Sequence, residues 1–136
     1  MYDRVVRASI LESARYQDLS SDSVRLLYRD LLHRADDFGN FEADFRALFN
    51  WLRPVTCIES REDLRQGCQE LEDSDLLRSY NDGEKQFFHI PRFRSDRRFV
   101  SRKCPESPWD DPKMVQRLSD QRSRAEKDRK PAAGLR

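Results

Sequence analysis

The chain has 136 residues, of which 38% are charged and 37% hydrophobic, so it can form one domain with a small core and some tail. No apolar run approaches the roughly 20 residues that a membrane-spanning helix needs, and the N-terminus does not resemble a signal peptide. We therefore expect a soluble cytoplasmic protein. The three cysteines are far apart and form no C-x-x-C pair, which argues against a disulfide framework and a zinc site.

The charges are unevenly distributed, although the net charge is only +1. Residues 1–91 carry twelve Lys and Arg against eighteen Asp and Glu. Residues 92–112 carry six against four, and residues 113–136 carry eight against three. An acidic body therefore carries a basic C-terminal third. Such a tail either seeks anions, nucleic acid among them, or only keeps the chain soluble.

The first predicted helix follows Ser20, a favourable N-cap residue. Its apolar side chains fall at helical spacing from Val24 to Ala35, and the turn sequence of residues 36–40 should end it. The two aspartates of that turn stand where the helix dipole disfavours negative charge, so they serve either the turn itself or a basic partner. The stretch 2–11 is either a short strand or an irregular lead-in.

Two more predicted helices follow. An apolar stripe from Phe45 to Leu52 indicates the second, and Pro54 should end it. Ser60, with an acidic residue three positions later, resembles a capping box and predicts the start of the third. The apolar stripe of this helix consists of Leu64, Cys68 and Leu71. Gly67 lies inside it at a cost of about 1 kcal/mol relative to Ala, which a close helix–helix contact could explain.

A β-hairpin is predicted directly after the third helix. Residues 76–80 and 86–90 have the alternating pattern of strands, and residues 81–84 read Asn-Asp-Gly-Glu, a turn sequence. Two strands alone are marginal in water, so the ribbon should bury one face against the three helices. Residues 5–10 could add a third strand. The fold class is therefore α+β, a winged helix-turn-helix with three helices plus a β-hairpin wing.

The character of the chain changes after Phe93. Residues 94–103 are basic, and three prolines interrupt regular structure at positions 105, 108 and 112. The last segment, up to residue 130, has only weak helical spacing. We therefore place a winged-helix domain at residues 1–104 and an extended, proline-containing basic tail, helical or disordered, at residues 105–136.

Several short motifs occur in a characteristic order between about residues 15 and 108. They are Arg15-Tyr16, Arg25-Leu26-Leu27-Tyr28, Ala35-Asp36-Asp37-Phe38-Gly39, Asp75-Leu76-Leu77 and Ile90-Pro91-Arg92-Phe93. Their order resembles the N-terminal winged-helix domain of phage and prophage replication initiators, the replisome-organiser type related to DnaD-like proteins. The resemblance implies DNA binding at a replication origin, with a helicase or helicase loader as a further partner.

The expected DNA-binding residues form three groups. The first group lies in the third helix, off its apolar stripe, and consists of Arg61, Arg65, Gln66 and Gln69. Arginine side chains could hydrogen-bond guanine, and glutamine side chains could hydrogen-bond adenine. At the hairpin tip, Lys85 could contact a phosphate. After the hairpin, six cations could line a phosphate backbone: Arg92, Arg94, Arg97, Arg98, Arg102 and Lys103. Among them, Phe99 could stack on a base, so the expected partner is duplex DNA and also single-stranded DNA.

The third helix also supports a competing hypothesis. Residues 59–73 contain two arginines against six carboxylates, a composition unsuited to a helix pressed among phosphates. In this alternative the chain is a protein-interaction module or transcriptional regulator whose acidic helix face binds a basic host or phage partner. Neither His33 nor His89 has partners at metal-ligand spacing, and no nucleophile–base set is recognisable. We therefore expect no metal, no other cofactor and no enzymatic activity.

Overall fold

The chain is α+β, with five helices and one three-stranded antiparallel sheet in the residues that the structure describes. The structure is a computed structural model that describes residues 13–53, 58–95 and 98–134. The helices are α2 (Ala14–Gln17), α3 (Asp22–Arg34), α4 (Phe45–Leu52), α5 (Arg61–Asp73) and α6 (Pro112–Gly134). The strands are β1 (Asn40–Glu42), β2 (Arg78–Asn81) and β3 (Gln86–His89). The strand considered for residues 5–10 and the stop expected at Pro54 lie outside the described residues.

Serine caps fix where two of the helices begin. The hydroxyl of Ser60 accepts the backbone N–H of Asp63 at 3.1 Å, which confirms the predicted start of α5. The cap of α3 is Ser21, whose hydroxyl accepts from the backbone N–H of Val24 at 3.3 Å, so the prediction of Ser20 is wrong by one residue. Two neighbouring serines are equivalent by sequence. Tertiary structure decides between them, because the Ser20 N–H donates instead to a carboxylate of α5 at 2.7 Å.

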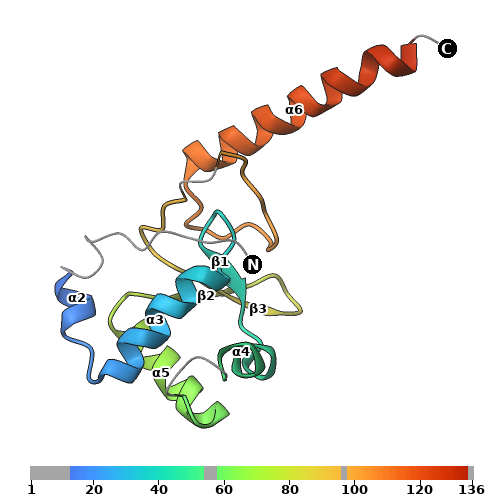
Figure 1. The fold of residues 1–136 in the computed structure, drawn as a ribbon. Helices are drawn as coiled ribbons and strands as arrows, with labels where there is room; N and C mark the ends of the chain where they lie inside the picture. The colour runs from blue at the N-terminus through green and yellow to red at the C-terminus, as the bar shows by residue number, and fades with distance from the viewer. Residues whose placement is uncertain (1–12, 54–57, 96–97, 135–136) are drawn as a thin grey trace.

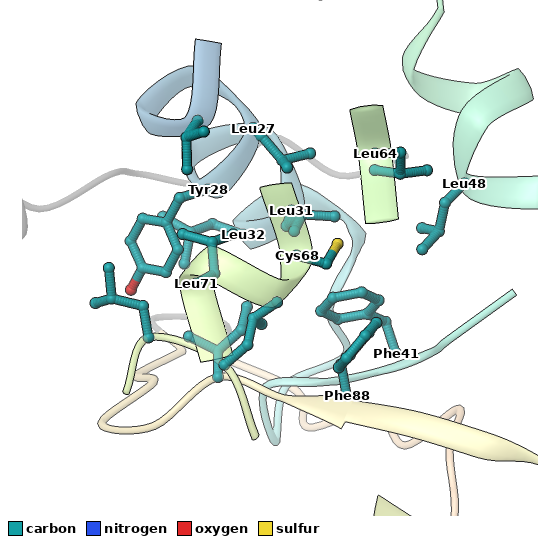
Figure 2. Close-up of a cluster of buried hydrophobic side chains, with 14 of the residues drawn as sticks. Leu27, Tyr28, Leu31, Leu32, Phe41, Leu48, Leu64, Cys68, Leu71 and Phe88 are labelled. Carbon is teal, nitrogen blue, oxygen red and sulfur yellow. The ribbon is translucent and has the colours of Figure 1, made fainter. Parts of the chain in front are cut away.

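The hydrophobic core lies between α3, α4, α5 and one face of the sheet (Figure 2). The three helices contribute the fully buried side chains of Leu27, Leu31, Leu48, Leu64, Cys68 and Leu71, and the sheet contributes Phe41 and Phe88, which are also buried. The contact between α3 and α5 is close at Gly67, where a Cβ atom would lie 2.7 Å from the Cδ2 atom of Leu27. This explains the glycine inside α5, since any larger side chain would overpack the core.

The sheet has the strand order β1-β3-β2, so the hairpin strand β3 is central. The hairpin was predicted correctly in kind, and its turn is closed by Asp82, whose Oδ1 accepts the backbone N–H groups of Glu84 and Lys85. The strand beside it comes from residues 40–42, where no strand was predicted and Asn40 was assigned to a turn. A strand of three residues has no detectable period of its own and is defined by its pairing with β3.

Both faces of β3 are covered. The register with β2 places Tyr80 opposite Phe87, so these side chains share one face of the sheet, while Phe88 points to the other face and into the core (Figure 2). The first face is covered by residues 98–111, called the strap below: the Tyr80 hydroxyl donates to the Pro105 carbonyl at 2.9 Å. The expectation of a ribbon with a single buried face is therefore wrong for β3, in which Phe87, Phe88 and His89 are all buried.

The strap leads into α6, which is joined to the body by a second, small apolar cluster. That cluster consists of Phe38, Val100, Met114 and Leu118. Beyond these first turns α6 extends away from the body, and α5 lies at the opposite end of the molecule (Figure 1). The division of the chain at residue 104 stays a prediction, but Arg102 and Asp110 bond across it.

Candidate nucleic-acid interface

Two adjacent carboxylates after α3 hold the strap on the body of the protein. Oδ2 of Asp36 accepts the backbone N–H groups of Lys103 at 3.1 Å and Cys104 at 3.3 Å. Oδ2 of Asp37 accepts the N–H of Ser101 at 2.7 Å. Both aspartates are almost completely buried, with exposed fractions of 3% and 1%. Of the two roles left open by the sequence, the structure therefore supports bonding within the chain, since neither carboxylate faces solvent.

Asp36 also closes the turn between α3 and β1. Its Oδ1 accepts the N–H groups of Phe38 at 2.9 Å and Asn40 at 3.1 Å. Burial raises the pKa of Asp36 above its usual value, although the four N–H donors work in the opposite direction. Gly39 has φ +81° here, and a Cβ atom would lie 2.7 Å from the Cβ of Phe93. The turn therefore needs glycine for both backbone angle and space.

A second polar network connects the strap to the sheet through Asp110. Its Oδ2 accepts from Arg102 at 2.7 Å, and its Oδ1 accepts from the Asn40 amide at 2.9 Å and the Ser107 hydroxyl at 2.7 Å. Burial alone would raise the pKa of Asp110, but these bonds hold it below its usual range. The Arg102 guanidinium also lies 3.8 Å from the ring centroid of Phe38. This arginine is engaged inside the protein, and we leave it out of the proposed DNA contacts.

His89 completes this network as a neutral, buried base. Its Nδ1 lies 2.7 Å from Oδ1 of Asn40, and its ring lies 5.7 Å from that of Trp109. Because the Asn40 amide nitrogen donates to Asp110, the amide oxygen faces His89, so Nδ1 carries the hydrogen. Burial lowers the pKa of His89 to about 4.

We expect the free energy of unfolding to fall as the pH is lowered from about 6.5 to about 4. In that window the unfolded chain binds a proton on His89 while the folded chain does not, so the unfolded state is favoured, by roughly 3 kcal/mol at most. Urea midpoints at a series of pH values measure this slope. His89→Gln should flatten it, and His33→Gln controls for the loss of a histidine. Equal slopes in wild type and His89→Gln would contradict this assignment.

The predicted reader face of α5 is exposed but lies among acidic groups. Arg61, Arg65, Gln66 and Gln69 all reach solvent. Gln66 donates to Glu62 at 3.5 Å and Gln69 donates to Asp73 at 3.0 Å, so both amides already bond carboxylates of their own helix. Base contacts would have to replace these bonds inside a field that repels phosphate.

The hairpin tip is not cationic either. Lys85 is exposed, but its Nζ lies 3.5 Å from a carboxylate oxygen of Glu42. Its neighbours Asp82 and Glu84 are exposed acids. A phosphate contact by Lys85 therefore remains a prediction with an unfavourable charge environment.

The cations after the hairpin do not all share one role. Arg92 pairs with Asp75, with a charge separation of 3.6 Å and a 2.9 Å bond to the Asp75 carbonyl. Arg97 lies outside the described residues. Arg92 is nevertheless 52% exposed, and solvent is also reached by Arg94, Arg98, Phe99 and Lys103. Arg92 and Arg94 precede the strap, and the other three lie within it.

The helix α6 adds exposed cations that the sequence did not single out as site residues. They are Lys113, Arg117, Arg122, Arg124 and Lys127. The available signal was the excess of eight basic over three acidic residues after position 112. The folded helix arranges these cations on one continuous element. Arg117 donates to the Arg98 carbonyl at 3.3 Å, which places α6 beside Arg98.

Within the described ranges, no three potential metal-ligating side chains come together, and no helix combines the length and apolar character needed to cross a membrane. Comparisons of the chain with protein-family models, curated proteins and solved structures found no match. Function can therefore be proposed only from the fold, the charge distribution and the sequence resemblance.

Proposed function

We propose that this chain is a winged-helix DNA-binding protein of phage or prophage origin that acts in replication initiation. The element order α3-β1-α4-α5-β2-β3, with β1 paired to β3, supports a winged helix-turn-helix with the hairpin as its wing. The role in replication rests on the motifs that resemble replisome organisers, and a helicase or its loader is the proposed further partner.

The observation that carries DNA binding is the difference in charge between α5 and α6, which lie at opposite ends of the molecule (Figure 1). Exposed cations gather on the strap and α6, whereas α5 carries five carboxylates against two arginines. Duplex DNA carries about one charge per 1.7 Å, so phosphate is attracted to the α6 end and repelled by α5. We therefore propose that backbone contacts by Arg94, Arg98 and α6 dominate, with little base reading.

The test is a salt series on duplex affinity. We expect the quadruple variant Arg94→Ala, Arg98→Ala, Arg122→Ala, Arg124→Ala to bind duplex at least about tenfold more weakly at about 50 mM salt. Its slope of log K against log salt should be flatter by up to about 3.5, because each lost phosphate contact removes roughly 0.9. Fluorescence anisotropy with a labelled duplex measures both quantities.

A matched control removes four exposed arginines that lie outside the strap and α6, on or next to α2, α3 and α4: Arg15→Ala, Arg29→Ala, Arg46→Ala, Arg53→Ala. The net charge changes equally, so this variant should keep most of the wild-type slope. Equal losses in the two variants would show that only net charge matters, and would count against a defined interface. A loss of duplex affinity only in the variant Arg61→Ala, Arg65→Ala would show that the DNA contact lies on α5.

The acidic face of α5 supports a second candidate, an interaction module for a basic protein. Glu62, Asp63 and Asp73 are all exposed on this helix. A helicase loader is the partner that the sequence resemblance suggests. Calorimetry with purified loader and the variant Glu62→Gln, Asp63→Asn, Asp73→Asn tests it. Two results together would favour this candidate. The wild-type chain would bind the loader but no duplex at low salt, and the variant would lose the loader binding.

A further inference from the structure

Phe99 is held in solvent beside a cation. Its side chain is 63% exposed, the largest fraction among the exposed large hydrophobic residues of the described chain. The guanidinium carbon of Arg98 lies 5.7 Å from the centroid of its ring. A ring with a guanidinium over it offers one group for the face of a base and one for its phosphate.

The backbone on either side of Phe99 is fixed to α6. The Arg98 carbonyl accepts from Arg117 at 3.3 Å. The Val100 N–H donates to the Gln121 side chain at 2.9 Å, and the Gln121 amide donates back to the Val100 carbonyl at 3.0 Å. The Val100 side chain is 3% exposed and packs in the second apolar cluster. Three hydrogen bonds and the buried Val100 side chain therefore hold Phe99 pointing outward. Binding then costs little further conformational entropy at this position.

Further cations continue from this ring along α6. Arg117 and Arg124 lie four residues before and three residues after Gln121, so helical geometry places them on the same side of α6 as the bond to Val100. Both side chains are exposed. A strand that stacks one base on Phe99 would find further cations for its phosphates on this side of α6.

We infer that Phe99, Arg98 and Arg124 form a binding site for single-stranded DNA, with one base stacked on the Phe99 ring. This inference rests on the proposed function and names the form of DNA that this part of the interface takes. In a duplex both faces of each base are covered by its neighbours, whereas a single strand can present a face to an aromatic side chain. The site needs no particular base, because every base has such a face.

Anisotropy of the full chain with a labelled oligo(dT) and with a duplex of mixed sequence tests the inference. Phe99→Ala and Phe99→Leu should each weaken oligo(dT) binding by about 5- to 100-fold, since stacking one base contributes that much. Duplex affinity should change less than about twofold, and the salt slope should not change, because stacking releases no counterions. Phe99→Trp should restore affinity and add a fluorescence signal that oligo(dT) quenches.

Leu26→Ala is the matched control, because Leu26 is an exposed hydrophobic residue on α3, 39% exposed and far from the strap in sequence. It should bind both DNAs as wild type does. Wild-type affinity of Phe99→Leu for oligo(dT) would overturn the inference and leave the proposed function standing. Equal losses on duplex and single strand would also overturn it, in favour of a wedge between base pairs. A wild-type chain that binds neither DNA would refute the proposed function itself.

Discussion

Asp36→Ala is expected to lower the free energy of unfolding by about 3–5 kcal/mol, which would leave little stability in a domain of this size. The substitution removes the acceptor of four backbone N–H groups, two in the turn before β1 and two in the strap. The site is almost fully buried, so water cannot replace the carboxylate without opening the structure. Urea unfolding followed by circular dichroism measures the loss.

Two further variants serve as controls for Asp36→Ala. Asp36→Asn keeps one acceptor oxygen and should lose less than Asp36→Ala. Asp120→Ala removes an exposed carboxylate of α6 and should change stability by less than about 0.5 kcal/mol. A loss below about 1 kcal/mol in Asp36→Ala would mean that the strap does not depend on this carboxylate.

Arg102→Leu is expected to cost about 3–5 kcal/mol of unfolding free energy while leaving DNA binding nearly unchanged. The side chains of Arg102 and Asp110 are only 13% and 6% exposed, and the bond between them is 2.7 Å long. Removing the arginine leaves a buried carboxylate without its counter-charge, which is the costly way to break such a pair. Thermal or urea unfolding gives the stability, and the salt series on duplex DNA gives the binding.

A double-mutant cycle measures the interaction energy between Arg102 and Asp110 apart from their other contacts. Arg102→Leu combined with Asp110→Asn should lower the unfolding free energy by less than the sum of the two single changes. The reason is that Asp110→Asn removes the buried negative charge that Arg102→Leu leaves unpaired. Arg98→Ala is the binding control, since it should flatten the salt slope and leave stability unchanged. A flattened slope with full stability in Arg102→Leu would return this arginine to the DNA interface.

The main helices and the hairpin could be predicted because their signals are local. Apolar spacing indicated α3, α4 and α5, and Ser60 marked the start of α5. The strand β1 and the short helix α2 could not, since three or four residues carry no period and depend on their neighbours. Ser20 failed as a cap for the same reason: its alternative partner lies on α5, fifty residues away in sequence.

The candidate site was predictable in composition but not in geometry. The sequence located a run of cations after the hairpin, yet it could not show that Asp110 neutralises Arg102 or that Asp75 pairs with Arg92. The first pair depends on how the strap returns over the sheet, and the second on how the chain after β3 lies against the turn before β2. Likewise, the positions of Asp36 and Asp37 indicated turn residues, but only the folded chain shows that they bind a segment more than sixty residues later.

If the chain binds DNA as proposed, the length of α6 sets how far it extends along the duplex. A helix of 23 residues measures about 35 Å, close to one full turn of B-form DNA. The protected footprint of one molecule therefore depends on this rod and not on the diameter of the folded body. Adding or deleting whole heptads in its exposed half should lengthen or shorten the footprint in steps of about 10 Å, three base pairs at a time.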